Sequence, residues 1–525
     1  MPLVLSKETQ EPYTPLGTAS TQLLLEQDFI IPDIKPDAAA ILHIHALPVL
    51  EEEKAAEGRI SFQGVLKLKV LTLTKDESQP LSSMEEQLPF ADFLRMDEVT
   101  RSTDVMLFCQ LSHLEYRLIN DRKISCKAIL TVTAQAYAPK PMEVLTSASG
   151  ENLETRRDFF LQSIQTPWKK EVLALQENLP LSSQTPTQVL LATADVVPND
   201  SKAVPGGISI AGDLAITLLL APEGGSVESR EVTLPFHTTI ESPSATEDMA
   251  AETCFRLEKL SAYPLPDDLG EETTLHIDAD LCVLCCGHGI METPYLADAY
   301  STAQPVKLET TTQTITTPVG QTLLHASFPA RFTLEETDEG ILQLLSVDTC
   351  GFLDRCVAQT DGVLTEGAVT LRVLYLTNQS DPPVAFWEGT APFSETVSLP
   401  NTQSGDEAQG RLISQWASVR SLNERELEAT IHVLLQVSSC RPTSITAVSN
   451  LEETDETPAS LPSLVIYVVQ TGDTLWKIAK RFSTTVDQIL ALNELEEDTP
   501  LYPGQKLLLL RTVSPYGTTT TQPES

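Results

Sequence analysis

The stretch GVLTEGAVTLRVLYLT, residues 362–377, decides the fold of most of this chain because two related stretches precede it. These are GRISFQGVLKLKVLTL at residues 58–73 and GGISIAGDLAITLLLA at residues 206–221. In the first of them, apolar residues alternate with polar ones between Leu66 and Val70, the pattern of a strand with one buried face. Each stretch is therefore predicted to be a strand of an antiparallel sheet.

Each copy continues with a Pro-Phe dipeptide and then a second apolar strand. The glycine-to-proline spacings are 25, 23 and 25 residues, and the glycines themselves recur after 148 and 155 residues. Such a period is too long for a solenoid repeat and has the length of a whole domain. The repeated residues are Gly64, Gly212 and Gly367, followed by Pro89-Phe90, Pro235-Phe236 and Pro392-Phe393.

The repeat predicts a mainly β chain of three tandem antiparallel domains, sandwich-like or barrel-like, at residues 21–145, 150–292 and 296–445. Polar and proline-containing segments flank them. We expect a flexible arm at residues 1–20, an acidic proline-containing linker at 446–463 and a disordered tail at 512–525.

The composition limits the classes of partner. A formal net charge of −38 disfavours nucleic acid and anionic membranes, because phosphate binding needs a basic face. No apolar stretch reaches the ~18 residues of a membrane span, and the N-terminal residues lack the pattern of a signal peptide. Nine cysteines at irregular spacing fit reduced thiols better than a disulfide framework. These features predict a cytoplasmic protein.

The C-terminal stretch 467–510, YVVQTGDTLWKIAKRFSTTVDQILALNELEEDTPLYPGQKLLLL, predicts a small module of a different kind. Apolar residues from Leu475 to Phe482 recur with the spacing of one helix face. The sequence from Thr485 to Gln488 is a capping box that begins a second helix. With a short strand on either side, residues 464–511 are predicted to fold in the order βααβ.

This module resembles the LysM domain, through Tyr467-Val468-Val469, Gly472-Asp473-Thr474-Leu475, Ile478-Ala479, Phe482, Leu492-Asn493 and Gly504-Gln505-Lys506-Leu507. The resemblance implies binding of N-acetylglucosamine polymers such as peptidoglycan between the first strand–helix loop and the second helix–strand loop. Some LysM modules bind proteins instead. The candidate residues for binding a glycan or a protein are Gly472, Asp473, Thr474, Leu475, Trp476, Lys477, Lys480, Leu492, Asn493 and Leu495.

Trp476 follows a core position and is expected to turn away from the buried stripe of its helix. It is either an interface anchor or packed at the edge of the module against Lys480 or the last strand. Lys477, Lys480 and Arg481 form a positive cluster on the same helix. This cluster is either a solvated face or a docking surface for an acidic partner.

Three β-domains followed by one LysM module resemble the SPOCS-domain proteins of the spore coat, of the SipL-like and SpoVID-like type. The third copy carries the closest match, at Gly367, Val373-Leu374-Tyr375 and Pro392-Phe393, whereas the first two copies lack the tyrosine. The resemblance implies a non-enzymatic protein of endospore coat assembly that works in the mother-cell cytoplasm at the forespore surface. Its LysM module would dock onto the coat morphogenetic ATPase SpoIVA, and other coat proteins are further partners. The alternative is a peptidoglycan- or N-acetylglucosamine-binding protein that acts through the LysM groove.

Cys282-x-x-Cys285-Cys286-x-His288 contains residue types that bind zinc. In a strand, however, Cys282 and Cys286 share one face while Cys285 points the other way. The three thiols cannot easily reach one ion, so we interpret them as core or surface cysteines, with a metal site as the alternative.

No other pattern indicates catalysis. His43-x-His45 lies in an apolar alternating run and is interpreted as part of a strand. The segment 207–211, GISIA, lacks the second glycine of the GxSxG motif and the helix that follows it. We therefore predict no catalytic residue, no metal site and no cofactor.

Overall fold

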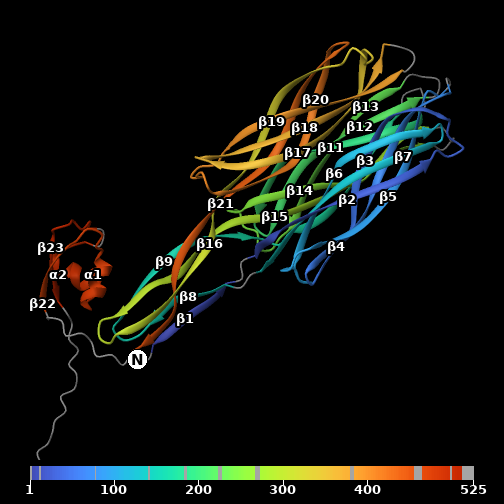
Figure 1. The fold of residues 1–525 in the computed structure, drawn as a ribbon. Coiled ribbons are helices and arrows are strands. Elements are labelled where there is room, and N and C mark those ends of the chain that lie inside the picture. Colours follow the sequence, from blue (N-terminus) through green and yellow to red (C-terminus); the bar gives the residue numbers. More distant parts are fainter. Residues whose placement is uncertain are drawn as a thin grey trace, which may run out of the picture.

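The computed structural model describes residues 3–10, 13–76, 79–139, 142–181, 186–222, 227–266, 272–378, 383–454, 464–496 and 499–510. These residues form an elongated body of strands with a small helical module beside one end (Figure 1). None of the helices in these ranges is long and apolar enough to cross a membrane. The predicted tail, 512–525, and residues 455–463 of the predicted linker lie outside the described residues.

The first domain is a sandwich of two three-stranded antiparallel sheets. Buried Leu66 and Leu68 from one sheet and Leu130 and Val132 from the other belong to one apolar core, which the alternation of apolar and polar residues along each strand produces. One sheet has the order β3 (Ala38–Ala56), β4 (Arg59–Thr74), β5 (Leu81–Arg95), and the other β2 (Tyr13–Ile30), β7 (Lys123–Pro139), β6 (Asp104–Asn120).

The other two domains repeat this arrangement, so the predicted fold class is confirmed with sandwiches and not barrels. The second domain has the sheets β11 (Pro186–Val204), β12 (Gly207–Pro222), β13 (Glu228–Glu241) and β10 (Lys169–Pro180), β15 (Glu272–Ser301), β14 (Ala250–Pro266). The third has β17 (Ile341–Gln359), β18 (Gly362–Thr377), β19 (Val384–Ser398) and β16 (Val306–Thr333), β21 (Glu426–Glu453), β20 (Glu407–Asn423).

The repeated glycine and Pro-Phe dipeptide have a direct packing explanation. Each glycine pairs across the sheet with the phenylalanine of its own repeat: Gly64 with Phe90, Gly212 with Phe236 and Gly367 with Phe393. A Cβ atom on these glycines would lie 2.8, 2.6 and 2.7 Å from the ring Cζ atom, and 2.2, 2.8 and 2.3 Å from a carbonyl oxygen of the neighbouring strand. No side chain larger than hydrogen fits between these two groups.

The three domains close into a ring. At each interface, β3 or its equivalent in one domain (β11 or β17) contacts β6 or its equivalent in the next domain (β14 or β20). Glu53 of β3 pairs with Arg256 of β14 at 2.6 Å, and Val196 of β11 accepts a hydrogen bond from Ser414 of β20. Gly351 of β17 accepts one from Gln110 of β6 at 2.9 Å, which joins the third domain back to the first. The arrangement is therefore a closed pseudo-threefold one and not a string of separate domains.

Equivalent residues also meet at one end of the ring. Leu71, Leu219 and Leu374 each lie seven residues after the repeated glycine, and all three belong to one buried cluster. Each domain thus contributes the same surface to a shared apolar centre.

At the other end, each domain extends a two-stranded ribbon. β1 (Val4–Gln10) pairs with β8 (Met142–Ser149), and β9 (Leu153–Gln165) pairs with the C-terminal half of β15. In the third domain β16 pairs with β21 along their whole length, and the N-terminal half of β16 with the C-terminal half of β21 forms the ribbon. The ribbons form the narrow part of the body in Figure 1, which we call the stalk. Two buried residues from each ribbon share one cluster: Leu145, Ala148, Leu296, Ala299, Val448 and Leu451.

The stalk corrects two predictions. The expected flexible arm, residues 1–20, contains β1 and the start of β2, and the first eight residues of the expected linker continue β21 to Glu453. Leu3, Leu5 and Val448 pack into the stalk, which stabilises strands that their local composition disfavours.

The C-terminal module has the predicted βααβ order. β22 (Leu464–Val468) pairs antiparallel with β23 (Lys506–Leu510), and between them lie α1 (Leu475–Phe482) and α2 (Val486–Asn493). Thr474 and Thr485 cap the two helices by accepting hydrogen bonds from the backbone N–H groups of Lys477 and Gln488.

Replacing the repeated glycine should therefore destabilise its domain. Gly367→Ala forces a Cβ atom against Phe393 and the Phe352 carbonyl, and overpacking of this kind costs roughly 1–3 kcal/mol. Equilibrium urea unfolding measures the effect. Gly320→Ala is the control, because the added Cβ there meets only the Leu399 side chain, at 3.1 Å. Equal stability of the two variants would contradict this explanation of the repeat.

Candidate functional site

The loop between β22 and α1 is built by some of the predicted binding residues. The Asp473 carboxylate accepts hydrogen bonds from the Gln470 N–H and the Tyr467 hydroxyl, each at 2.7 Å. These bonds lower the pKa of Asp473, so it remains ionised and holds the loop closed. Gly472 has a φ of +86°, which favours glycine, and Thr474 is the helix cap. Asp473 and Thr474 thus shape the loop.

Asn493 has a similar role on the other side of the module. Its side-chain amide donates to the carbonyl oxygens of Ile489 and Leu508, each at 2.8 Å, and its oxygen accepts from the Leu508 N–H at 2.7 Å. These three bonds fix the end of α2 to β23.

The two loops lie side by side. Val469 donates to the Gln505 carbonyl and accepts from the Gly504 N–H, each at 2.9 Å. Gly472 and Thr474 on one loop are exposed, as is Leu492 at the end of α2, whereas Leu475 and Leu495 are half-buried. This edge of the module has the exposed backbone and apolar side chains that the glycan hypothesis needs.

The α1 face of the module packs against the stalk. The Trp476 indole N–H donates to Asp298 at 2.8 Å, and the Lys480 ammonium contacts the other oxygen of the same carboxylate at 2.5 Å. The Tyr300 ring meets Trp476 edge-on at 4.9 Å, and its hydroxyl donates to the Thr484 carbonyl at 2.8 Å. Asp298 and Tyr300 lie near the C-terminal end of β15, so the module is docked on the second domain.

Tyr300 is the main apolar contact of this docking. It is only 4% exposed, and it belongs to the same cluster as the module's own core residues Ile478 and Ala479. Arg156 of β9 lies 6.0 Å from the Trp476 ring on the stalk side. A tyrosine from the body thus completes the core of the module.

The structure therefore assigns Trp476 and Lys480 to an intramolecular contact. The sequence predicted Trp476 to be an interface anchor or to pack at the edge of the module, and neither alternative involved the body of the protein. Lys477 lies outside this contact: it is exposed, and its ammonium donates to the Gly472 carbonyl at 3.0 Å. No local pattern marks Asp298, Tyr300 or Arg156, because their role depends on how two distant parts of the chain come together.

The cysteines of β15 lie on opposite faces of a strand, as predicted. Cys282 packs with Met106 and Tyr137 of the first domain, whereas Cys285 packs in the core of the second. Burial raises the pKa of both thiols to about 12, so they are protonated at neutral pH.

Cys286 and His288 instead meet Glu252, which the sequence pattern did not suggest. His288 contacts one oxygen of the Glu252 carboxylate, and Arg411 of the third domain contacts the other at 2.5 Å. Gln165 donates to the Cys286 sulfur at 3.2 Å. The guanidinium thus already supplies the positive charge here, and the group is an ion-pair network between two domains.

Comparison with known families agrees with this geometry. A model described as "SipL, SPOCS domain" matches residues 37–119, 186–264 and 340–420, and a LysM domain model matches residues 467–509. Together these ranges cover more than half of the chain. The chain belongs to the SipL-type SPOCS–LysM proteins. Each SPOCS match spans the four strands from β3 to β6, or their equivalents, and does not include the strands that form the ribbons.

Two curated relatives match short parts of the chain. The probable endopeptidase p60 of Listeria grayi is 41% identical over 66 residues, 13% of each protein. The uncharacterized protein YkzQ of Bacillus subtilis (strain 168) is 52% identical over 40 residues, which are 8% of this chain and 52% of that protein. The chain thus spans a small part of the first relative and about half of the second. No solved structure matches.

These domains settle the broad class of the protein. SPOCS and LysM domains are binding or structural modules, and they associate the chain with sporulation and the spore coat.

Removing Tyr300 should release the module from the stalk. In Tyr300→Ala, the module loses both the ring contact with Trp476 and the hydrogen bond to Thr484. We expect faster hydrogen–deuterium exchange in peptides that cover α1, and no change with Tyr263→Ala, which alters an exposed tyrosine of β14. Unchanged exchange in Tyr300→Ala would contradict the docking.

Acid should also release the module from the stalk and speed exchange in the same peptides. Burial by itself raises the pKa of Asp298, but hydrogen bonds from Lys480 and Trp476 outweigh it and lower that pKa, so the contact is lost as pH falls through the lowered value.

Proposed function

We propose that this chain is a non-enzymatic structural and interaction protein of endospore coat assembly. Its LysM module docks onto a coat morphogenetic ATPase of the SpoIVA type, in the mother-cell cytoplasm at the forespore surface. The observation that carries the proposal is the position of the module, held by Asp298 and Tyr300 at the end of a stalk to which all three SPOCS domains contribute. Such a shape suits a protein that reaches from one layer to another.

The α1 face is the surface proposed for the protein partner. It combines the aromatic Trp476 with the cationic Lys477 and Lys480, a combination that suits binding to an acidic partner. Asp298 of the stalk occupies part of this face by the same chemistry, since it accepts bonds from both Trp476 and Lys480. A partner with its own carboxylate would replace Asp298, and many copies bound to one surface would give avidity to weak single contacts.

A second candidate function is binding of N-acetylglucosamine polymers, and a specific observation favours it. Gly472, Thr474 and Leu492 lie away from the stalk contact and are exposed while the module is docked. A glycan could therefore bind with Trp476 in place, whereas a protein partner on the α1 face must displace the stalk.

Reversing the charge of Lys477 tests the protein-docking proposal. Lys477→Glu in the full-length chain should weaken binding of the purified SpoIVA-type ATPase by about tenfold or more, because a rim cation becomes an anion. Lys506→Glu is the control, since it makes the same charge change on β23. Equal binding by the wild type and both variants would remove the α1 face from the proposal.

Titration with chitin oligosaccharides decides between the two candidates. Saturable binding that is lost in Leu492→Asp but kept in Lys477→Glu would support the glycan function. The protein-docking proposal predicts no saturable binding by the wild type in the same titration.

A further inference from the structure

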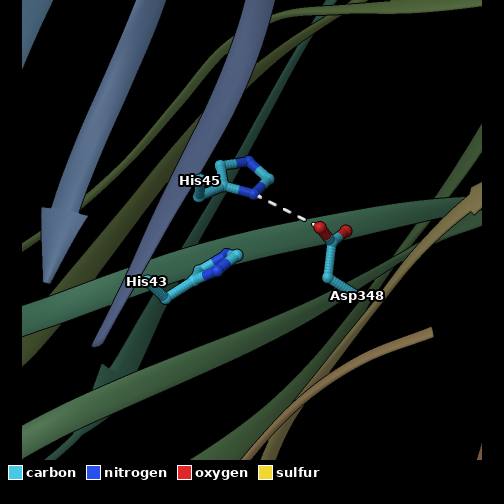
Figure 2. A group of neighbouring side chains, drawn as sticks. All are labelled: His43, His45 and Asp348. Atoms are coloured by element: carbon cyan, nitrogen blue, oxygen red, sulfur yellow. Dashed lines mark ion pairs between the residues drawn. The ribbon is translucent and has the colours of Figure 1, made fainter. Parts of the chain in front are cut away.

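Two histidines and an aspartate converge where the ring of domains closes. His43 and His45 are two residues apart on β3 of the first domain, so both side chains leave the same face of the strand. Asp348 faces them from β17 of the third domain. Figure 2 shows the two imidazole rings and the carboxylate directed toward a common space, although the sequence separates the histidines from the aspartate by about three hundred residues.

The spacing of the three groups fits one small cation. One ligand atom from each residue lies within 4.8 Å of the others, and His45 Nδ1 is 3.7 Å from Asp348 Oδ2. This distance is too long for a hydrogen bond. Zinc binds nitrogen and oxygen at 2.0–2.1 Å in tetrahedral sites, which places neighbouring ligand atoms about 3.3 Å apart. Small side-chain rotations would therefore bring all three groups into the first coordination sphere.

Packing between the two domains fixes the position of one of the three groups. His43 is 4% exposed. Its ring stacks on Phe386 of the third domain with the centroids 4.8 Å apart, which fixes the ring orientation.

Charged groups surround this site. Arg372 pairs with Asp348 at 3.8 Å and more closely with Glu388 at 2.8 Å. Asp195 of the second domain, to which Thr349 donates at 3.4 Å, is half-buried close by. Carboxyl groups from the second and third domains thus gather beside the two histidines of the first. At the Glu252, Cys286 and His288 group, by contrast, Arg411 binds the carboxylate directly.

We propose that His43, His45 and Asp348 form a binding site for a divalent transition-metal ion of the zinc class, which joins the first SPOCS domain to the third. Two imidazoles and one carboxylate favour zinc, cobalt or nickel over magnesium and calcium, which prefer oxygen ligands. Water completes the coordination. The ion clamps the ring at the interface that joins the last domain to the first.

Metal analysis of the full-length protein, purified without a histidine tag, tests this site. After equilibration with zinc and dialysis, the wild type should retain about one ion per chain and unfold at a higher temperature than the metal-free protein, because a ligand that binds only the folded state stabilises it. Asp348→Asn and His45→Asn should each weaken zinc binding by at least about tenfold. His237→Gln, which alters an exposed histidine of β13, should bind like the wild type.

Cobalt provides a direct view of the ligands. The wild type should develop the visible absorption bands of tetrahedral cobalt, and Asp348→Asn should not, even where its circular dichroism shows a folded chain. Absence of stoichiometric zinc from the wild type would overturn the proposal. So would equal zinc affinity of the wild type and the folded Asp348→Asn and His45→Asn variants.

Discussion

The rest of the structure depends on the burial of one apolar face by each two-stranded ribbon. An isolated pair of strands is marginal in water, because it has no second layer on which to bury its apolar side chains. Here each ribbon finds that layer in the other two, where Leu145, Leu296 and Val448 share one cluster. Three tandem domains consequently become a single body, with the ring at one end and the stalk at the other (Figure 1).

Closing the ring also explains why so many polar groups are buried between domains. The same two kinds of surface meet at each interface, and the ring closes after three domains. The residues on these surfaces differ from domain to domain, so each surface fits its own neighbour. The second domain meets the third through Glu252 and Arg411, whereas the third meets the first through Asp348 and the histidines of β3. Divergence at equivalent strands makes each interface specific, and it leaves a different set of side chains in each.

The sequence predicted what local pattern and repetition control. The glycine and the Pro-Phe dipeptide recur because Gly367 and Phe393, with their equivalents, are in contact within each sandwich, and the LysM helices follow from their caps and apolar spacing. It could not predict the stalk, because strands such as Val4–Gln10 are stabilised by partners about 140 residues away. The role of Trp476 was hidden for the same reason, since Asp298 lies 178 residues before it.

Docking of the LysM module on the stalk links the architecture to the proposed function. Because Asp298 binds the side chains that the proposed protein partner would use, the proposal couples partner binding to release from the stalk. The affinity of the full-length protein for the SpoIVA-type ATPase, measured for the wild type and for Asp298→Ala, tests this coupling most directly. The account predicts tighter binding by Asp298→Ala, since the α1 face is then available in a larger fraction of molecules. Equal or weaker binding by that variant would contradict it.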